Sequence, residues 1–447
     1  MPWYKNRLKQ ALRNSTADGT ASSVMSAITG TYTTPFALAL GASDMHIGLL
    51  NSLPKLAGTL SQSFAGQWIR ATASRKSACN IAALFSRLIW LPIALIPFIF
   101  TDNPIFWLIG LLSISQMASS LATTAWASWM GDLVPVRIMG RYFGMRNAVG
   151  GMAAFLTTII AGTILTTLDG MFGFTTIFIL AVAAGLISNF YLRRIPDVSS
   201  VDGRYARSTM KEFVKELKFN IDFRKFTFYI TAFYLATYIA APFFIVSMLK
   251  DFNIGYEAFT LIIALNVLTT IVSQPYWGRL ADRFGDKAVL TVCSFFTTMV
   301  PGLWLFVHEP IGMAAVYILS GFGWAGFDLA TFNYLLGVTH HRPSYIANYS
   351  MLTGFAIVAG PLIGGFLAQS DISFATLRGL SMLFLVSFIF RAVFSILLLP
   401  GLVETRPAKT PPSTLVLLWK SMTIYPIRFF SHELAVAQHY IYHHRRR

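Results

Sequence analysis

Charged residues are scarce in this sequence. They make up 12% of its 447 residues, whereas a soluble globular domain carries about 25%. Apolar residues make up 55%, and the mean hydropathy is +0.59. Because a water-soluble fold could not bury so much apolar surface, the composition predicts a protein whose solvent is the lipid bilayer.

Cysteine is also rare, and the common catalytic motifs are absent. The two cysteines, Cys79 and Cys293, are far apart in the sequence, which argues against a disulfide framework and a thiolate metal site. There is no P-loop, nucleophile elbow or His-Glu-x-x-His motif, so we predict no enzymatic activity, no cofactor and no ATP-driven pump. His439 and His443 have metal-ligand spacing on a helix, but they lie among basic residues typical of contact with anionic headgroups.

Long apolar runs dominate what is present. About twelve of them reach the length of about 20 residues that crosses a bilayer core. Helices are expected because lipid cannot satisfy an open strand edge. The predicted spans are 19–41, 46–68, 77–100, 105–131, 147–168, 172–193, 225–249, 255–278, 288–307, 310–337, 347–369 and 378–400. The fold class is therefore an all-α membrane protein.

Basic residues are concentrated in alternate loops. The formal net charge is +16, and most of the 35 Lys and Arg residues lie in the two tails and in every second loop. The other set of loops holds only Lys250 and Arg378. This pattern predicts an even number of spans, with both termini in the cytoplasm. It explains the basic excess by topology rather than by nucleic-acid binding, and we expect a multi-pass protein of a prokaryotic inner membrane.

The two halves of the chain resemble each other. Ser61-Gln62 followed by Gly66 recurs as Ser273-Gln274 followed by Gly278, each time before a basic loop. Internal repeats are typical of transporters, in which the substrate binds between the repeats. The pattern predicts twelve transmembrane helices in two pseudo-symmetric six-helix bundles. The predicted segments are a cytoplasmic tail (1–18), the two bundles (19–193 and 225–400), a cytoplasmic linker (194–224) and a basic, partly interfacial tail (401–447).

The most specific motif follows the eighth predicted span. It runs from Gly278 to Lys287 with the sequence GRLADRFGDK. This stretch resembles the G-x-L-A-D-R-x-G-R-K loop of the major facilitator superfamily, between the second and third helices of a half. The resemblance implies a gate in which Asp282 faces a helix N-terminus, Arg283 pairs across the loop, and Gly278 and Gly285 permit the turn and the close contact.

The equivalent loop of the first half departs from this pattern. Arg70 occupies the position of the acidic residue, so the acid is missing or is supplied elsewhere. Asp132 is a candidate supplier, and it begins a stretch with Arg141 that resembles a functionally unassigned prokaryotic subset of the superfamily. The glycines around Gly360-Pro361 resemble the family's Gly-Pro-Gly-Gly helix.

Ionisable residues within predicted spans are costly in lipid and are functional candidates. Lys55 and Asp328 lie on the spans that line the central cavity in the superfamily, and they are the predicted contacts for substrate or proton. Asp328 is the only carboxylate deep inside a predicted span, and a mutual Lys55–Asp328 ion pair is the structural alternative. Arg87 and Arg391 lie on peripheral spans, where we expect them to brace helices.

Taken with the polar candidates Asn51, Asn266 and Asn333 on cavity spans, these residues predict a secondary active transporter. It would move a small-molecule solute by alternating access, with H⁺ as a candidate coupling ion. The cationic excess within the spans favours an anionic solute. Transport of a metal ion or metal chelate is one alternative. A transport-dead membrane scaffold or sensor with the same fold is another, motivated by the altered first gate and the long tail.

The charge pattern makes the topology testable. We expect a cysteine introduced into the C-terminal tail to react with a membrane-impermeant thiol reagent only after the cytoplasmic face has been opened, because the basic loops are retained on that side. Labelling in intact cells would contradict the predicted orientation.

Overall fold

The computed structural model describes residues 2–72, 74–168, 170–197, 217–339, 343–370 and 379–405. These residues are mostly helical and form no strand. Ten of the described helices are long and apolar enough to cross a membrane, which confirms the predicted all-α membrane fold. The candidates His439 and His443, the rest of the tail and most of the linker lie outside the described residues.

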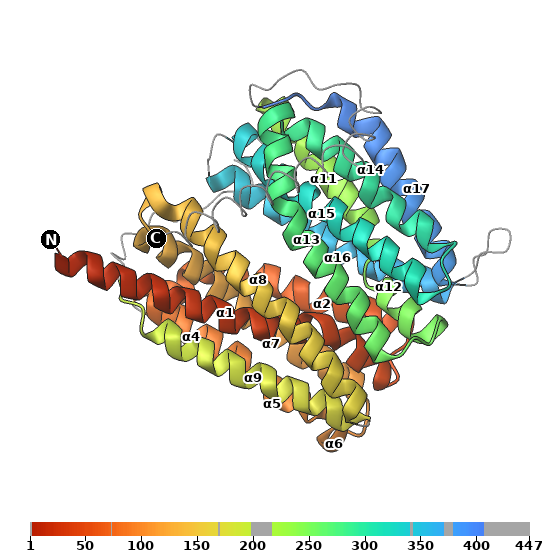
Figure 1. Ribbon diagram of the computed structural model, residues 1–447, viewed down its shortest axis with the longest axis horizontal. Coiled ribbons are helices and arrows are strands. Elements are labelled where there is room, and N and C mark those ends of the chain that lie inside the picture. The colour runs from red at the N-terminus through yellow and green to blue at the C-terminus, as the bar shows by residue number, and fades with distance from the viewer. Residues whose placement is uncertain are drawn as a thin grey trace, which may run out of the picture.

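The N-terminal helices form one group (Figure 1). They are α1 (Pro2–Ala39), α2 (Asp44–Gln62), α3 (Ala65–Ala71), α4 (Arg75–Leu88), α5 (Trp90–Ala94), α6 (Ile96–Ile99), α7 (Pro104–Leu133), α8 (Val136–Thr167) and α9 (Met171–Arg193). Helix α1 already begins at Pro2 and so includes most of the predicted tail. Neither α1 nor α2 is among the ten apolar helices, so the count of twelve spans stays a prediction.

The C-terminal helices form a second group, inclined to the first (Figure 1). They are α11 (Ile221–Ala240), α12 (Phe243–Val246), the π-helix η1 (Ser247–Asp251), α13 (Tyr256–Phe284), α14 (Asp286–Trp304), α15 (Pro310–Thr339), α16 (Pro343–Gln369), α17 (Leu380–Leu398) and the 3₁₀ turn η2 (Leu399–Gly401). A break at Pro242 separates α11 from α12, because proline has no amide hydrogen to continue the helix.

The outer faces of both groups carry large apolar side chains. Ile160 on α8, Phe228 on α11 and Phe366 on α16 are among the many that are well exposed. Exposed apolar surface on this scale exceeds what a water-soluble monomer shows. It fits helices whose outer faces contact lipid.

The two groups meet at one end of the molecule. We call the end with the basic turns before α4 and α14 the basic end, and the other the opposite end. At the opposite end α2 packs along α16, where the Ser52 hydroxyl donates to the Val358 carbonyl at 2.7 Å. Gly48 permits this approach, because a Cβ there would lie 2.6 Å from the Pro361 carbonyl oxygen. The Lys250 amine also reaches the Asp44 carboxylate at 3.2 Å.

A second contact joins α1, α8 and α13. The buried Tyr32 hydroxyl donates to the Thr158 carbonyl at 2.7 Å and lies 3.0 Å from the Thr260 hydroxyl. Gly162 on α8 faces the Thr260 side chain. Together with the α2–α16 contact, this arrangement holds the two groups together toward the opposite end.

The close packing of Gly48 against α16 gives a test of the contact at the opposite end. Gly48→Val should destabilise the described state by about 1–3 kcal/mol through overpacking against Pro361. A cysteine introduced at the buried Ser52 should then react faster with a thiol reagent, and thermal unfolding in detergent should begin earlier. Gly110→Val is the control, because no atom lies within 4 Å of a Cβ at Gly110. Equal labelling in both backgrounds would show that this contact does not keep the end closed.

Candidate functional site

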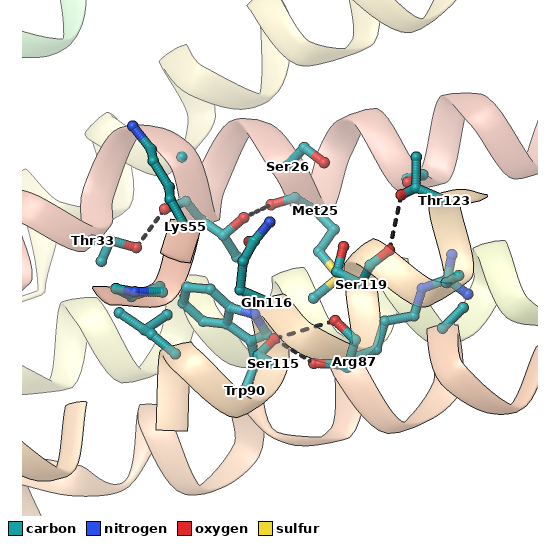
Figure 2. A pocket seen from close by; sticks show the side chains of 18 of the residues that line it. Met25, Ser26, Thr33, Lys55, Arg87, Trp90, Ser115, Gln116, Ser119 and Thr123 are labelled. Atoms are coloured by element: carbon teal, nitrogen blue, oxygen red, sulfur yellow. Dashed lines mark hydrogen bonds between the residues drawn. The ribbon is translucent and has the colours of Figure 1, made fainter. Parts of the chain in front are cut away.

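A polar cavity of 630 Å³ lies within the N-terminal group, and we call it the first cavity. Its walls come mainly from α1, α2, α4 and α7. Figure 2 shows its lining, in which Ser26, Thr33, Ser115, Ser119 and Thr123 supply hydroxyl groups. Lys55 and Arg87 also line it. The site therefore offers hydroxyl and cationic groups to a ligand.

A buried ion-pair network forms one wall of this cavity. The Asp18 carboxylate lies 3.9 Å from Arg87 and 3.6 Å from Arg146. The Ser188 hydroxyl donates to Asp18 at 2.6 Å and accepts from Arg87 at 2.7 Å, and Arg87 also donates to Asn189 at 3.1 Å. One acid thus links two arginines, and helices α1, α4, α8 and α9 are joined through them.

Asp18 corrects the sequence interpretation. The residue is only 3% exposed and lies inside α1, so Asp328 is not the only carboxylate deep in the helical groups. The sequence placed Asp18 in the tail because the apolar run begins one residue later. The one feature of the sequence that could have indicated its burial is its position. A residue immediately before a predicted span can belong to the same helix as that span.

A smaller, aromatic cavity of 350 Å³ lies within the C-terminal group, and we call it the second cavity. Asp328 and Asn266 line it, beside Tyr234, Tyr238 and Trp324. Asp328 lies in α15 and is exposed. The Asn266 amide donates to the Tyr317 carbonyl at 2.8 Å.

The two predicted brace arginines also line the cavities, rather than standing apart from them. Arg87 lines the first and Arg391 the second. Arg391 is 2% exposed and donates to the Ser387 hydroxyl at 3.1 Å and the Thr297 carbonyl at 2.7 Å. It also donates to the Thr237 carbonyl at 3.4 Å. Arg391 therefore joins α17 to α14 and α11, which is the bracing role expected from the sequence.

Lys55 lies where the two cavities meet. Its amine is 4.5 Å from the centre of the Tyr238 ring, and Tyr238 lines the second cavity. No ion pair joins Lys55 to Asp328 within the part of the chain that the structure describes. The alternative of a mutual ion pair therefore does not hold in this conformation.

Two asparagines differ in their placement. Asn51 lines the first cavity, and its amide donates to the Ile47 carbonyl at 3.0 Å. Asn333 is not a lining residue of either cavity and instead donates to the Asp286 carboxylate at 3.1 Å. It supports the turn before α14, and its contact with substrate or proton stays a prediction.

The predicted gate residues lie at the basic end. Asp132 pairs with Arg75, which places the candidate acid of the first half beside its loop, whereas Arg141 is exposed. In the second half Asp282 and Arg283 are exposed and Gly278 is half-buried. Asp282 forms no hydrogen bond or ion pair with any residue that the structure describes.

Gly285 forms the turn between α13 and α14, with φ of +90°, a conformation that favours glycine. The role of Glu404 was not predicted, because this residue lies in the segment predicted to be the tail. The Glu404 carboxylate accepts from the backbone amides of Asp286 at 3.2 Å and Lys287 at 3.0 Å. It therefore caps the N-terminus of α14, where negative charge is favoured.

Comparison with known proteins agrees with this architecture. The sequence profile described as Major Facilitator Superfamily matches residues 226–437. No curated protein matches the sequence significantly. Together with the helical fold and the structural relatives, the profile match confirms the resemblance to the major facilitator superfamily that the sequence predicted.

Solved structures of transporters share the fold at low sequence identity. A variant of the nucleoside transporter NupG has a TM-score of 0.65 and 15% identity, covering 88% of this chain and 98% of its own. The xylose transporter XylE from E. coli, partially occluded and inward open, has a TM-score of 0.65 and 13% identity, covering 92% and 100%. A bacterial homologue of the iron transporter ferroportin, in an inward-facing state, has a TM-score of 0.63 and 12% identity, covering 88% and 98%.

The buried network gives a prediction about stability. Asp18→Asn keeps the shape of the side chain but leaves Arg87 and Arg146 without their shared carboxylate. We expect a loss of about 3–5 kcal/mol, typical of breaking a buried pair, measured as unfolding in detergent. The matched control is Asp132→Asn, whose acid is 52% exposed in its pair with Arg75 and should cost about 0–1 kcal/mol. Equal losses in the two variants would show that Asp18 does not hold the helices together.

Proposed function

We propose that this protein is a secondary transporter that carries a small solute by alternating access. The observation that carries the proposal is the pair of cavities, lined by ionisable side chains of both helix groups and closed by helix contacts toward one end. Ionisable side chains within membrane spans are costly, and those that face a cavity mark transport pathways. The structural relatives described as nucleoside and xylose transporters support the same class of function. The protein is accordingly a carrier rather than an enzyme.

The contacts at the two ends support an alternating mechanism. The opposite end is held by the Ser52–Val358 hydrogen bond and the Lys250–Asp44 pair. At the basic end, Asp282 is exposed and has no described partner. A gate acid without a partner in this state fits a contact that forms only when the basic end closes. The charge pattern supports a cytoplasmic basic end, and with that orientation the described conformation would be inward-facing.

Asp328 is the proposed site of proton coupling. It is an acid in α15 that faces a cavity, and no ion pair fixes it among the described residues. An acid with access to the cavity can exchange a proton in each half of the cycle. Asp18, in contrast, is held by two arginines, which suits a structural role.

The other candidate functions have weaker support. The described residues contain no cluster of three His, Cys, Asp or Glu side chains suited to a metal ion, so metal cargo would need ligands from elsewhere. A transport-dead scaffold would have no use for cavity-lining Lys55 and Asp328. It therefore explains fewer of the observed features than transport does.

The test is solute flux in liposomes that contain the purified protein, with and without a pH gradient. Asp328→Asn should abolish gradient-driven accumulation and spare downhill movement or exchange, because the coupled proton has no binding site. Wild-type accumulation in this variant, with unchanged thermal unfolding, would remove Asp328 from the coupling role. Asp102→Asn is the control, because it removes an exposed acid that lines neither cavity, and it should leave gradient-driven accumulation unchanged. Absence of flux for every solute in the wild-type protein would contradict transport.

A further inference from the structure

We infer that the solute is an organic anion with a planar aromatic body, whose anionic group binds Lys55 and whose ring lies in the second cavity. This inference rests on the proposed transport function and specifies its substrate class. It depends on two features of the cavities, their balance of charge and the different chemistry of their walls.

The charge balance favours an anion. The cationic residues among the described lining are Lys55, Arg87, Arg146 and Arg391, and the acidic ones are Asp18 and Asp328. Two cations are therefore left without an acid. Ionisable groups inside a membrane protein normally have a compensating partner, and a bound anion would compensate one of these two cations.

Lys55 is the cation that has room for this anion. Arg87 and Arg146 share Asp18, and Arg391 is held by three oxygen atoms. The Lys55 amine makes no hydrogen bond or ion pair with the described residues, and its contact is with the Tyr238 ring. In Figure 2 its side chain is extended, and no marked hydrogen bond ends on the amine. An ammonium group in such a position can bind a carboxylate without breaking an existing ion pair.

The wall next to Lys55 favours an aromatic ring. Tyr238 contacts Lys55 and also lines the second cavity with Tyr234 and Trp324. These three side chains are half-buried, so each presents surface to the cavity. The Tyr234 and Trp324 rings are nearly parallel, at 24° with centres 6.5 Å apart. Aromatic walls of this kind attract a flat apolar group through stacking and edge-to-face contacts.

The size and polarity of the cavities agree with one charged end and one ring. The second cavity measures 350 Å³, within the range of about 300–1,000 Å³ found for small-molecule sites. The first cavity is larger and carries many hydroxyl groups. A ring in the second cavity would leave its anionic group at Lys55, with polar substituents directed toward the first cavity.

The experiment measures binding rather than flux. Purified full-length protein in detergent is titrated with a panel of aromatic carboxylates, including benzoate and 2-naphthoate, each paired with its neutral amide, and with acetate. We expect at least one aromatic carboxylate to stabilise the protein more than its amide and more than acetate. The inference would be overturned if no aromatic carboxylate in the panel stabilised the protein more than its amide and more than acetate.

Variants locate the site. Lys55→Met should lower the affinity for the best carboxylate about tenfold or more and bring it to the level of the amide, whereas Lys55→Arg should retain the preference. The matched control is Lys218→Met, which removes an exposed lysine that lines neither cavity. Trp324→Leu should weaken the carboxylate and its amide alike. An unchanged carboxylate affinity in Lys55→Met would overturn the assignment of the anion to Lys55.

Two controls keep the outcome decisive. If Lys55→Met fails to fold, Lys55→Gln is measured in its place, and the wild-type difference between carboxylate and amide still tests the substrate class. Binding of aromatic anions without any solute flux would support the ligand class assigned to this site and contradict transport. Flux of a neutral solute without binding of any aromatic anion would support transport and overturn the assigned ligand class.

Discussion

The cost of placing charge in lipid organises this structure. A charged side chain inside a membrane must find a partner, reach water or be used in function. Asp18 satisfies two arginines with one carboxylate, and Arg391 is satisfied by hydroxyl and carbonyl oxygens. Because these groups come from different helices, the pairing that lowers the cost of each charge also fixes how the helices pack. Lys55 and Asp328 face the cavities, where the proposed anion would bind Lys55 and the proposed proton would bind Asp328.

The fold could be predicted from the sequence because hydropathy and loop charge act over whole segments. Apolar runs predicted the helices, and the GRLADRFGDK stretch predicted the superfamily. Individual partners were harder, because they depend on which helices pack together. The sequence proposed Asp132 as the acid of the first half and could not name Arg75 as its partner. Asp18 and Glu404 were not identified because Asp18 lies immediately before an apolar run and Glu404 lies after one, where hydropathy no longer reports on structure.

The contact at the opposite end also could not be predicted from the sequence. The glycines around Gly360-Pro361 were recognised from their spacing, but their contact with Gly48 on α2 joins the two halves of the chain. A side chain at Gly48 would meet the backbone of α16, so the small residue is required by the partner helix and not by its own. Such requirements become visible only when the two helices are seen together (Figure 1).

The two halves solve one structural problem with different residues. Before α4, the basic Arg75 pairs with Asp132 from the end of α7. In the second half, Glu404 beyond α17 accepts the amides at the start of α14, and the Lys287 amine donates to the Leu402 carbonyl at 2.5 Å. Each half thus anchors the start of its third long helix with an acid from a later segment. Because each acid lies in the same helix group as the turn it holds, these contacts would persist if the two groups move relative to each other as proposed. Asp282 makes no such contact among the described residues, as the proposed closure between the groups requires.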